Sequence, residues 1–165
     1  NIPVIYTKTH STPMRRFENY DQSFITPAQL YAAGVKFCIS NSESPFQTPH
    51  IRNLPYHAAK AASYGLPWDE ALRSITLSSA EILGVDEKVG SLEVGKEATF
   101  FIADGDILEV NTIVMMAFIQ GRKIDLNDRH KMLESKYRKK YQQLGILDTL
   151  KPRWKNMDLN STIEE

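Results

Sequence analysis

The chain has 165 residues, of which 42% are hydrophobic and 24% are charged, the composition of a globular protein large enough for a sizeable core. It carries 20 basic and 20 acidic side chains, so no overall field favours nucleic acid or an anionic membrane, and we expect neither as a partner. A single cysteine, Cys38, excludes an internal disulfide and a cysteine-based zinc cluster.

The first forty residues predict a strand, a helix and a second strand. Residues 2–7 and 35–40 are short apolar runs typical of strands buried on both faces, and Cys38 in the second run is expected to be a buried structural thiol. Between them, Thr26 is expected to cap a helix with Pro27 at its first position. The order strand, helix, strand favours parallel pairing.

The middle of the chain predicts a loop and three helices. Residues 41–52 are interpreted as a loop, and Asn53 as the cap of a helix that runs to about Tyr64. Pro67 is expected to open the next helix, which carries one apolar stripe.

A third, short helix is expected after these two. Ser78 and Glu81 have the spacing of a capping box, and Gly84 is expected to end this helix.

From residue 89 the pattern becomes that of β-structure. Residues 99–103 and 113–119 are predicted strands, and residues 120–121 a hairpin turn that returns a strand over 123–125. Residues 128–144 predict a charged helix, followed by a polar tail in which Trp154 is the expected anchor. One face of that helix is apolar and is expected to pack; it consists of Met132, Leu133, Tyr137, Tyr141 and Leu144.

The stretch 75–106 carries the most specific motif. It contains Thr76, Ala80 and Gly84, then Gly90-Ser-Leu-Glu, and then Gly95-Lys96 before a strand. This order resembles the C-terminal signature of the amidohydrolase superfamily, in the branch of imidazolonepropionase-like metal-dependent hydrolases. The likeness extends over residues 1 to about 125.

The resemblance implies an α/β fold, with a (β/α)8 barrel and a small composite β-sandwich. Residues 1–88 would then be the last two strands and helices of the barrel, residues 89–125 part of the sandwich, and residues 126–165 a C-terminal helix and tail. Because a core strand begins at residue 2, we expect a piece of a longer protein, with its N-terminal part as the main partner and a homo-oligomer as an option. An independent small α/β domain is the weaker alternative.

The resemblance also implies a divalent metal, zinc or manganese, that lowers the pKa of a bound water. The family's histidine ligands belong to earlier strands, and His10, His50, His57 and His130 show no His-x-His spacing. We therefore expect a metal in the intact protein and none bound by this chain alone.

Asn41 stands where the family has its catalytic aspartate, within Ser40-Asn41-Ser42. An amide cannot take a proton from water, so this position is expected to be degenerate, with Glu43 as a possible substitute. His10, Ser42, Glu43 and His50 are the candidate substrate-binding residues at the rim of the barrel. His57 is interpreted as a packing or capping histidine.

Two functions follow from the resemblance. In the first, the chain is the C-terminal portion of a metal-dependent hydrolase that acts on a non-peptide C–N bond of a small, cyclic-amide-like substrate, and it is not active alone. In the second, it is a catalytically degenerate scaffold or interaction domain, a hypothesis that rests on Asn41.

Overall fold

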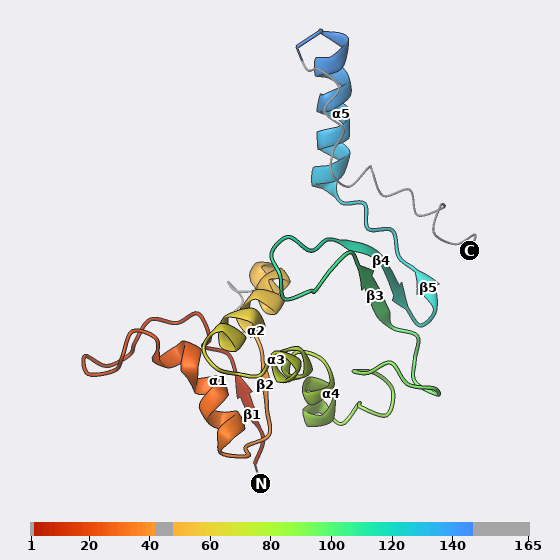
Figure 1. The fold of residues 1–165 in the computed structure, drawn as a ribbon. Coiled ribbons are helices and arrows are strands. Elements are labelled where there is room, and N and C mark those ends of the chain that lie inside the picture. The colour runs from red at the N-terminus through yellow and green to blue at the C-terminus, as the bar shows by residue number, and fades with distance from the viewer. Residues whose placement is uncertain (1, 42–47, 147–165) are drawn as a thin grey trace. The chain divides into compact units, whose positions relative to one another are not determined.

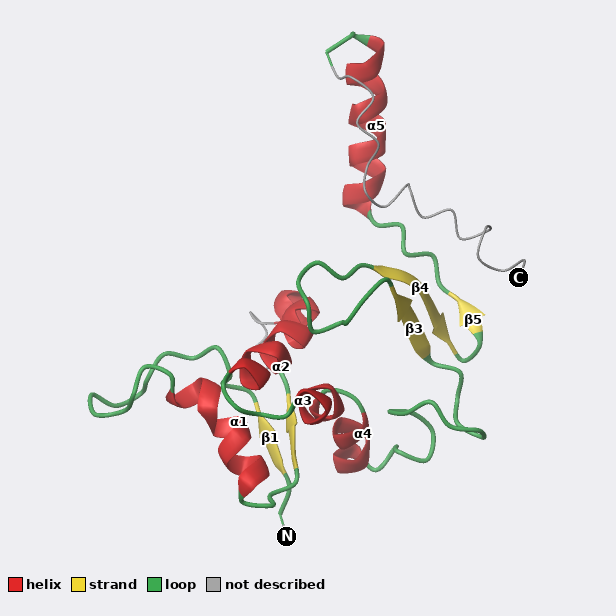
Figure 2. Ribbon diagram, in the orientation of Figure 1, coloured by secondary structure: helices red, strands yellow, loops and turns green. Residues whose placement is uncertain are grey.

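The structure, a computed structural model, describes residues 2–41 and 48–146 (Figure 1). The chain divides into two compact units, residues 1–123 and 124–165. The first unit is α/β, with a parallel pair of strands among four helices and a separate antiparallel sheet (Figure 2). None of the helices in the described ranges is both long and apolar enough to cross a membrane.

Strands β1 (Val4–Tyr6) and β2 (Phe37–Ile39) pair in parallel, with Ile5 opposite Cys38, as the sequence predicts. All three residues of β2 are buried, because β2 contacts both β1 and the surrounding helices. This burial confirms that the thiol of Cys38 is enclosed. The strand β1 is less covered, and Ile5 keeps 53% of its surface exposed.

Helix α1 (Gln22–Ala32) begins earlier than predicted and holds Pro27 in its interior. Proline has no N–H, so the carbonyl of Ser23 lacks its helical donor. The hydroxyl of Tyr6 donates to this carbonyl instead, at 2.8 Å. Thr26 is not a cap, because its hydroxyl donates back to the Gln22 carbonyl at 2.7 Å.

A short 3-10 helix, η1 (Thr48–Asn53), leads into α2 (Leu54–Ser63) and confirms the predicted position of that helix. Asn53 occupies the N-cap position of α2, as predicted, but its side chain makes no capping hydrogen bond within the part of the chain that the structure describes. The core combines small residues of the helices with large apolar residues of β2 and the connecting segments: Phe37, Ile39, Ala58, Ala61, Leu66, Ala71 and Leu108.

Helices α3 (Trp68–Ser74) and α4 (Leu77–Leu83) follow, and the predicted capping box is wrong. Ser78 lies inside α4, and Thr76 occupies the N-cap position immediately before the helix. Glu81 does not reach back to the helix start, because it pairs with Lys36 at 3.0 Å and Arg73 at 2.8 Å.

We call residues 84–96 the signature turn. Gly84 ends α4 in the left-handed conformation, with φ 68°, as predicted. Gly90 has φ +101°, and a Cβ there would lie 2.7 Å from the Cβ of Ala80. The ammonium of Lys96 donates to the Ser91 hydroxyl at 2.5 Å and to Glu93 at 3.3 Å. The motif therefore allows Gly90 to pack closely against Ala80 and stabilises the turn through the hydrogen bonds of Lys96.

The antiparallel sheet contains β3 (Phe100–Ala103), β4 (Val114–Ile119) and β5 (Arg122–Lys123) in that order. Gln120 and Gly121 both have positive φ, 50° and 76°, which confirms the predicted hairpin turn. The returning strand begins at Arg122, one residue earlier than predicted, and is shorter.

In the second unit, α5 (Arg129–Gln143) confirms the predicted helix, and the Asp128 carboxylate caps it by accepting from the Lys131 N–H at 2.9 Å. The side chains predicted to form its packed face keep 37% to 61% of their surface exposed. Trp154 lies outside the described residues.

Candidate functional site

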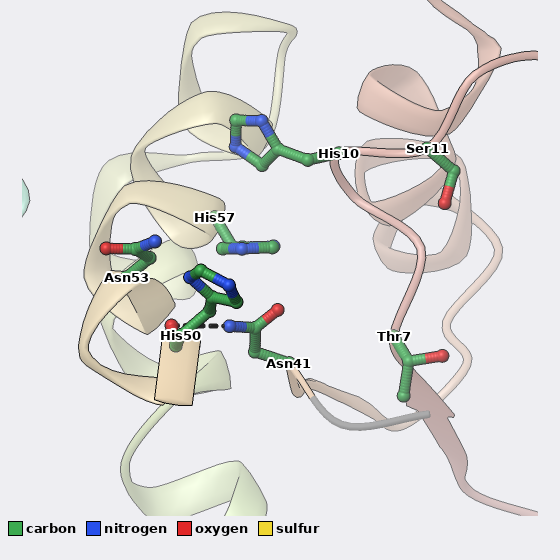
Figure 3. Close-up of a pocket in the computed structure, with 7 residues that line it drawn as sticks. All are labelled: Thr7, His10, Ser11, Asn41, His50, Asn53 and His57. Carbon is green, nitrogen blue, oxygen red and sulfur yellow. Dashed lines mark hydrogen bonds between the residues drawn. The ribbon is translucent and has the colours of Figure 1, made fainter. Parts of the chain in front are cut away.

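A pocket of about 190 Å³ lies beyond the carboxyl ends of β1 and β2 (Figure 3). Because parallel strands end at the same edge of a sheet, the segments that follow them meet there. Three segments line the pocket: the one after β1, the one after β2, and η1 with the start of α2. The residues are Thr7, His10, Ser11, Asn41, His50, Asn53 and His57.

Three of the residues proposed from the sequence share this pocket: His10, Asn41 and His50. The other two, Ser42 and Glu43, lie outside the described residues. Proximity alone does not assign a role, so the substrate contacts of His10 and His50 stay predictions.

Asn41 is buried, with 6% of its surface exposed. Its side-chain N–H donates to the main-chain carbonyl of His50 at 2.6 Å, the bond drawn dashed in Figure 3. This bond joins the end of β2 to η1. The carboxamide is therefore a donor to the protein backbone at the position where the resemblance places a base.

The sequence interpretation missed His57 as a pocket residue. Its ring lies 4.5 Å from that of His10, centroid to centroid, in an edge-to-face arrangement. Burial, and then the Coulombic interaction with His10, lower the pKa of His57 to about 4, so the ring is neutral at pH 7. Among the described residues its buried Nδ1 has no hydrogen-bond partner. No spacing signal points to it, because His10 and His57 meet only through the fold.

Aromatic contacts support the pocket from the side of α1 and α2. The ring of His10 lies 6.2 Å from that of Phe24, which lies 5.1 Å from that of Tyr64. The ammonium of Lys60 sits 4.6 Å from the centre of the Phe24 ring, a cation–π distance. These contacts place an aromatic pair and a cation beside the ring of His10.

The described residues do not fit a divalent metal. Within residues 2–41 and 48–146, no three His, Cys, Asp or Glu side chains are placed to hold one ion. The described lining residues carry imidazole, hydroxyl and amide groups and no carboxylate. Such a lining can exchange hydrogen bonds with a small polar molecule, and its imidazoles are the groups suited to proton transfer.

Comparison with known proteins relates the sequence of this chain to one family. A sequence model described as the amidohydrolase family matches residues 18–133. The chain is 36% identical over 72 residues to the amidohydrolase tasK of Hapsidospora irregularis, a match covering 44% of this chain and 7% of that protein. It is 35% identical over 71 residues to an imidazolonepropionase of Shewanella sp. (strain ANA-3), covering 43% of this chain and 17% of that protein.

Solved structures share the fold. The crystal structure of an amidohydrolase from Thermotoga maritima MSB8 matches with a TM-score of 0.57 and 24% identity, over 67% of this chain and 28% of that one. The chain thus spans less than a third of the length of these relatives.

Proposed function

Because the chain belongs to the amidohydrolase family, we propose that it supplies part of the substrate-binding end of a hydrolase that cleaves a non-peptide C–N bond in a small, cyclic-amide-like molecule. One observation carries this proposal. The polar pocket lies at the carboxyl ends of two parallel strands, the edge at which barrel enzymes bind their substrates.

In this proposal, residues 1–88 are the last two strands and helices of a (β/α)8 barrel, and residues 89–125 are part of a composite β-sandwich. The parallel pair with helices packed around β2 supports the first part. The separate antiparallel sheet after the signature turn supports the second. Among the described residues β1 pairs only with β2, so its other edge is then the one that an earlier barrel strand covers. The N-terminal part of the protein is thus the proposed partner, and the chain is not active alone.

A zinc or manganese ion in the intact protein would supply hydroxide near neutral pH. Since the described residues do not fit such an ion, its ligands would come from the rest of the protein. In this chain, His10 and His50 would contact the substrate, and neutral His57 would close the pocket wall between them. Asn41 does not serve as general base, because an amide has no proton affinity near pH 7. Glu43, outside the described residues, is the alternative base.

The test is hydrolysis by the intact protein, stripped of metal and assayed with small cyclic amides and imides such as hydantoin, with and without zinc or manganese. We expect activity only after metal is restored, and His50→Ala should raise KM more than it lowers kcat. Lys88→Met, an exposed change in the signature turn, is the matched control and should alter neither constant.

The alternative is a degenerate scaffold that keeps the fold without chemistry. The observation that favours this alternative is the hydrogen bond that the side-chain N–H of Asn41 donates to the His50 carbonyl. An intact protein that binds no metal and hydrolyses none of the substrates would establish this alternative and end the first proposal.

A further inference from the structure

Asn41 makes a contact that its place in the family pattern does not explain. It follows β2, its side chain is nearly closed off from solvent with 6% exposed, and its N–H donates to the His50 carbonyl at 2.6 Å. The pocket close-up shows this carboxamide beside His50 and below His57 (Figure 3).

The acceptor belongs to a segment that builds much of the pocket. Helix η1 contains His50 and Asn53, and it runs directly into α2, which contains His57. The bond from Asn41 therefore ties the end of β2 to the start of a run that carries three of the lining residues. Among the described residues, the other hydrogen bonds of η1 are those of its own 3-10 turns, and such turns are weakly bonded.

The chemistry of this contact requires a donor. A carboxamide N–H donates, whereas an ionised carboxylate only accepts. An aspartate in the same place would direct an oxygen with negative charge at a carbonyl oxygen, in surroundings with little water. An unpaired buried polar group typically costs about 1–3 kcal/mol, and a charged group costs more.

We propose that Asn41 is a positioning residue, whose carboxamide fixes η1 so that His50 and Asn53 line the pocket, and that a carboxylate cannot replace it. The inference rests on the proposed function only in treating this pocket as the ligand site. It assigns Asn41 a role of its own, distinct from that of a lost catalytic aspartate.

The test compares Asn41→Asp with Asn53→Asp in the intact protein. Both add one carboxyl group to the same pocket near the same titratable groups, His10, His50 and His57. Any electrostatic effect of a new carboxylate on these side chains therefore acts in both variants. Only Asn41→Asp removes the donor to the His50 carbonyl.

At pH 7 we expect Asn41→Asp to lower the ratio of folded to unfolded protein at least tenfold, and Asn53→Asp to change it less than threefold. At pH 4 the protonated carboxyl can donate again, so the deficit of Asn41→Asp against wild type should fall below threefold. Asn41→Ala, which has no titratable group, should show the same deficit at both pH values. The carbonyl ¹³C shift of His50 should move in Asn41→Asp at pH 7 and return towards the wild-type value at pH 4.

Equal stability of Asn41→Asp and wild type at pH 7, with an unchanged His50 carbonyl shift, would overturn the proposal. A deficit that does not depend on pH, or a variant that fails to fold at both pH values, would also overturn it. Because none of these measurements uses substrate, an inactive protein could still confirm the role of Asn41, and an active one could still refute it.

Discussion

The signature turn and the pocket are built in opposite ways. The signature turn is one contiguous stretch, and its recognisable residues are explained by contacts within a few positions: Gly90 against Ala80, and Lys96 with Ser91. The pocket draws its lining from three segments that only the parallel pairing of β1 and β2 brings together. The motif by which the family is recognised thus determines local packing and hydrogen bonding. The side chains that could take part in chemistry lie in the pocket.

The largest expected effect tests whether the signature turn depends on close packing. In Gly90→Ala the new Cβ would lie 2.7 Å from the Ala80 Cβ, and φ is +101°. Overpacking together with backbone strain should lower the free energy of unfolding by about 2–4 kcal/mol. Urea denaturation measures this loss.

The matched control is Gly95→Ala, where φ is +98° but a Cβ would meet nothing within 4 Å among the described atoms. It isolates the strain of a positive φ, about 1–2 kcal/mol. Equal losses in the two variants would show that backbone conformation alone sets the turn, and the contrast with the pocket would weaken.

The second prediction concerns the pocket and its pH dependence. The pKa of His57 is lowered from 6.5 to about 4, so the folded protein binds this proton less tightly than the unfolded chain. The stability contributed by neutral His57 is complete above pH 6.5 and is lost as the pH falls towards 4. Since one pKa unit corresponds to about 1.4 kcal/mol, the loss should be of the order of 2–3 kcal/mol.

The measurement is the free energy of unfolding between pH 7 and 4, for wild type and for His57→Gln. The variant should show a flatter profile over this range. Lys88→Met, the exposed change in the signature turn, is the control and should leave the profile as it is. If His57→Gln keeps the wild-type slope, the ring is not held neutral by its surroundings.

The third prediction tests the long-range bond that joins β1 to α1. Tyr6→Phe leaves the Ser23 carbonyl without a donor, because Pro27 has no N–H to offer. The expected loss is about 1–2 kcal/mol. In a Pro27→Ala background the helix regains its own N–H at this point, so the cost of Tyr6→Phe should be smaller there. A double-mutant cycle of unfolding free energies measures the coupling, and additive losses would contradict it.

Sequence patterns predicted the elements with strong local signals. The apolar runs located β1 and β2, and the positive-φ pair at Gln120 and Gly121 was visible as a hairpin turn. Errors arose where one residue had two local explanations. Pro27 looked like the first residue of a helix, but the fold supplies Tyr6 as a donor and keeps the proline inside α1.

The site was predictable only in part. His10, Asn41 and His50 were chosen from their places after the expected strands, and the structure does bring them together. His57 was not recognised, because a histidine among small helical residues has no local sign of a pocket. The hydrogen bond from Asn41 to the His50 carbonyl also depends on a path through the fold that no spacing rule describes.

The smallest expected effect concerns the polar residues of the signature turn. The test is whether these residues do more than stabilise the turn. Lys96 donates to Ser91 and Glu93 inside the turn, and it contributes nothing to the described lining of the pocket. Lys96→Met should therefore lower the free energy of unfolding by less than about 1 kcal/mol and leave KM for the cyclic-amide substrates unchanged. Urea denaturation and steady-state kinetics of the intact protein measure the two quantities. A raised KM with unchanged stability would show that Lys96 affects substrate binding. The contrast between a motif that only stabilises the fold and a pocket that binds the substrate would then fail.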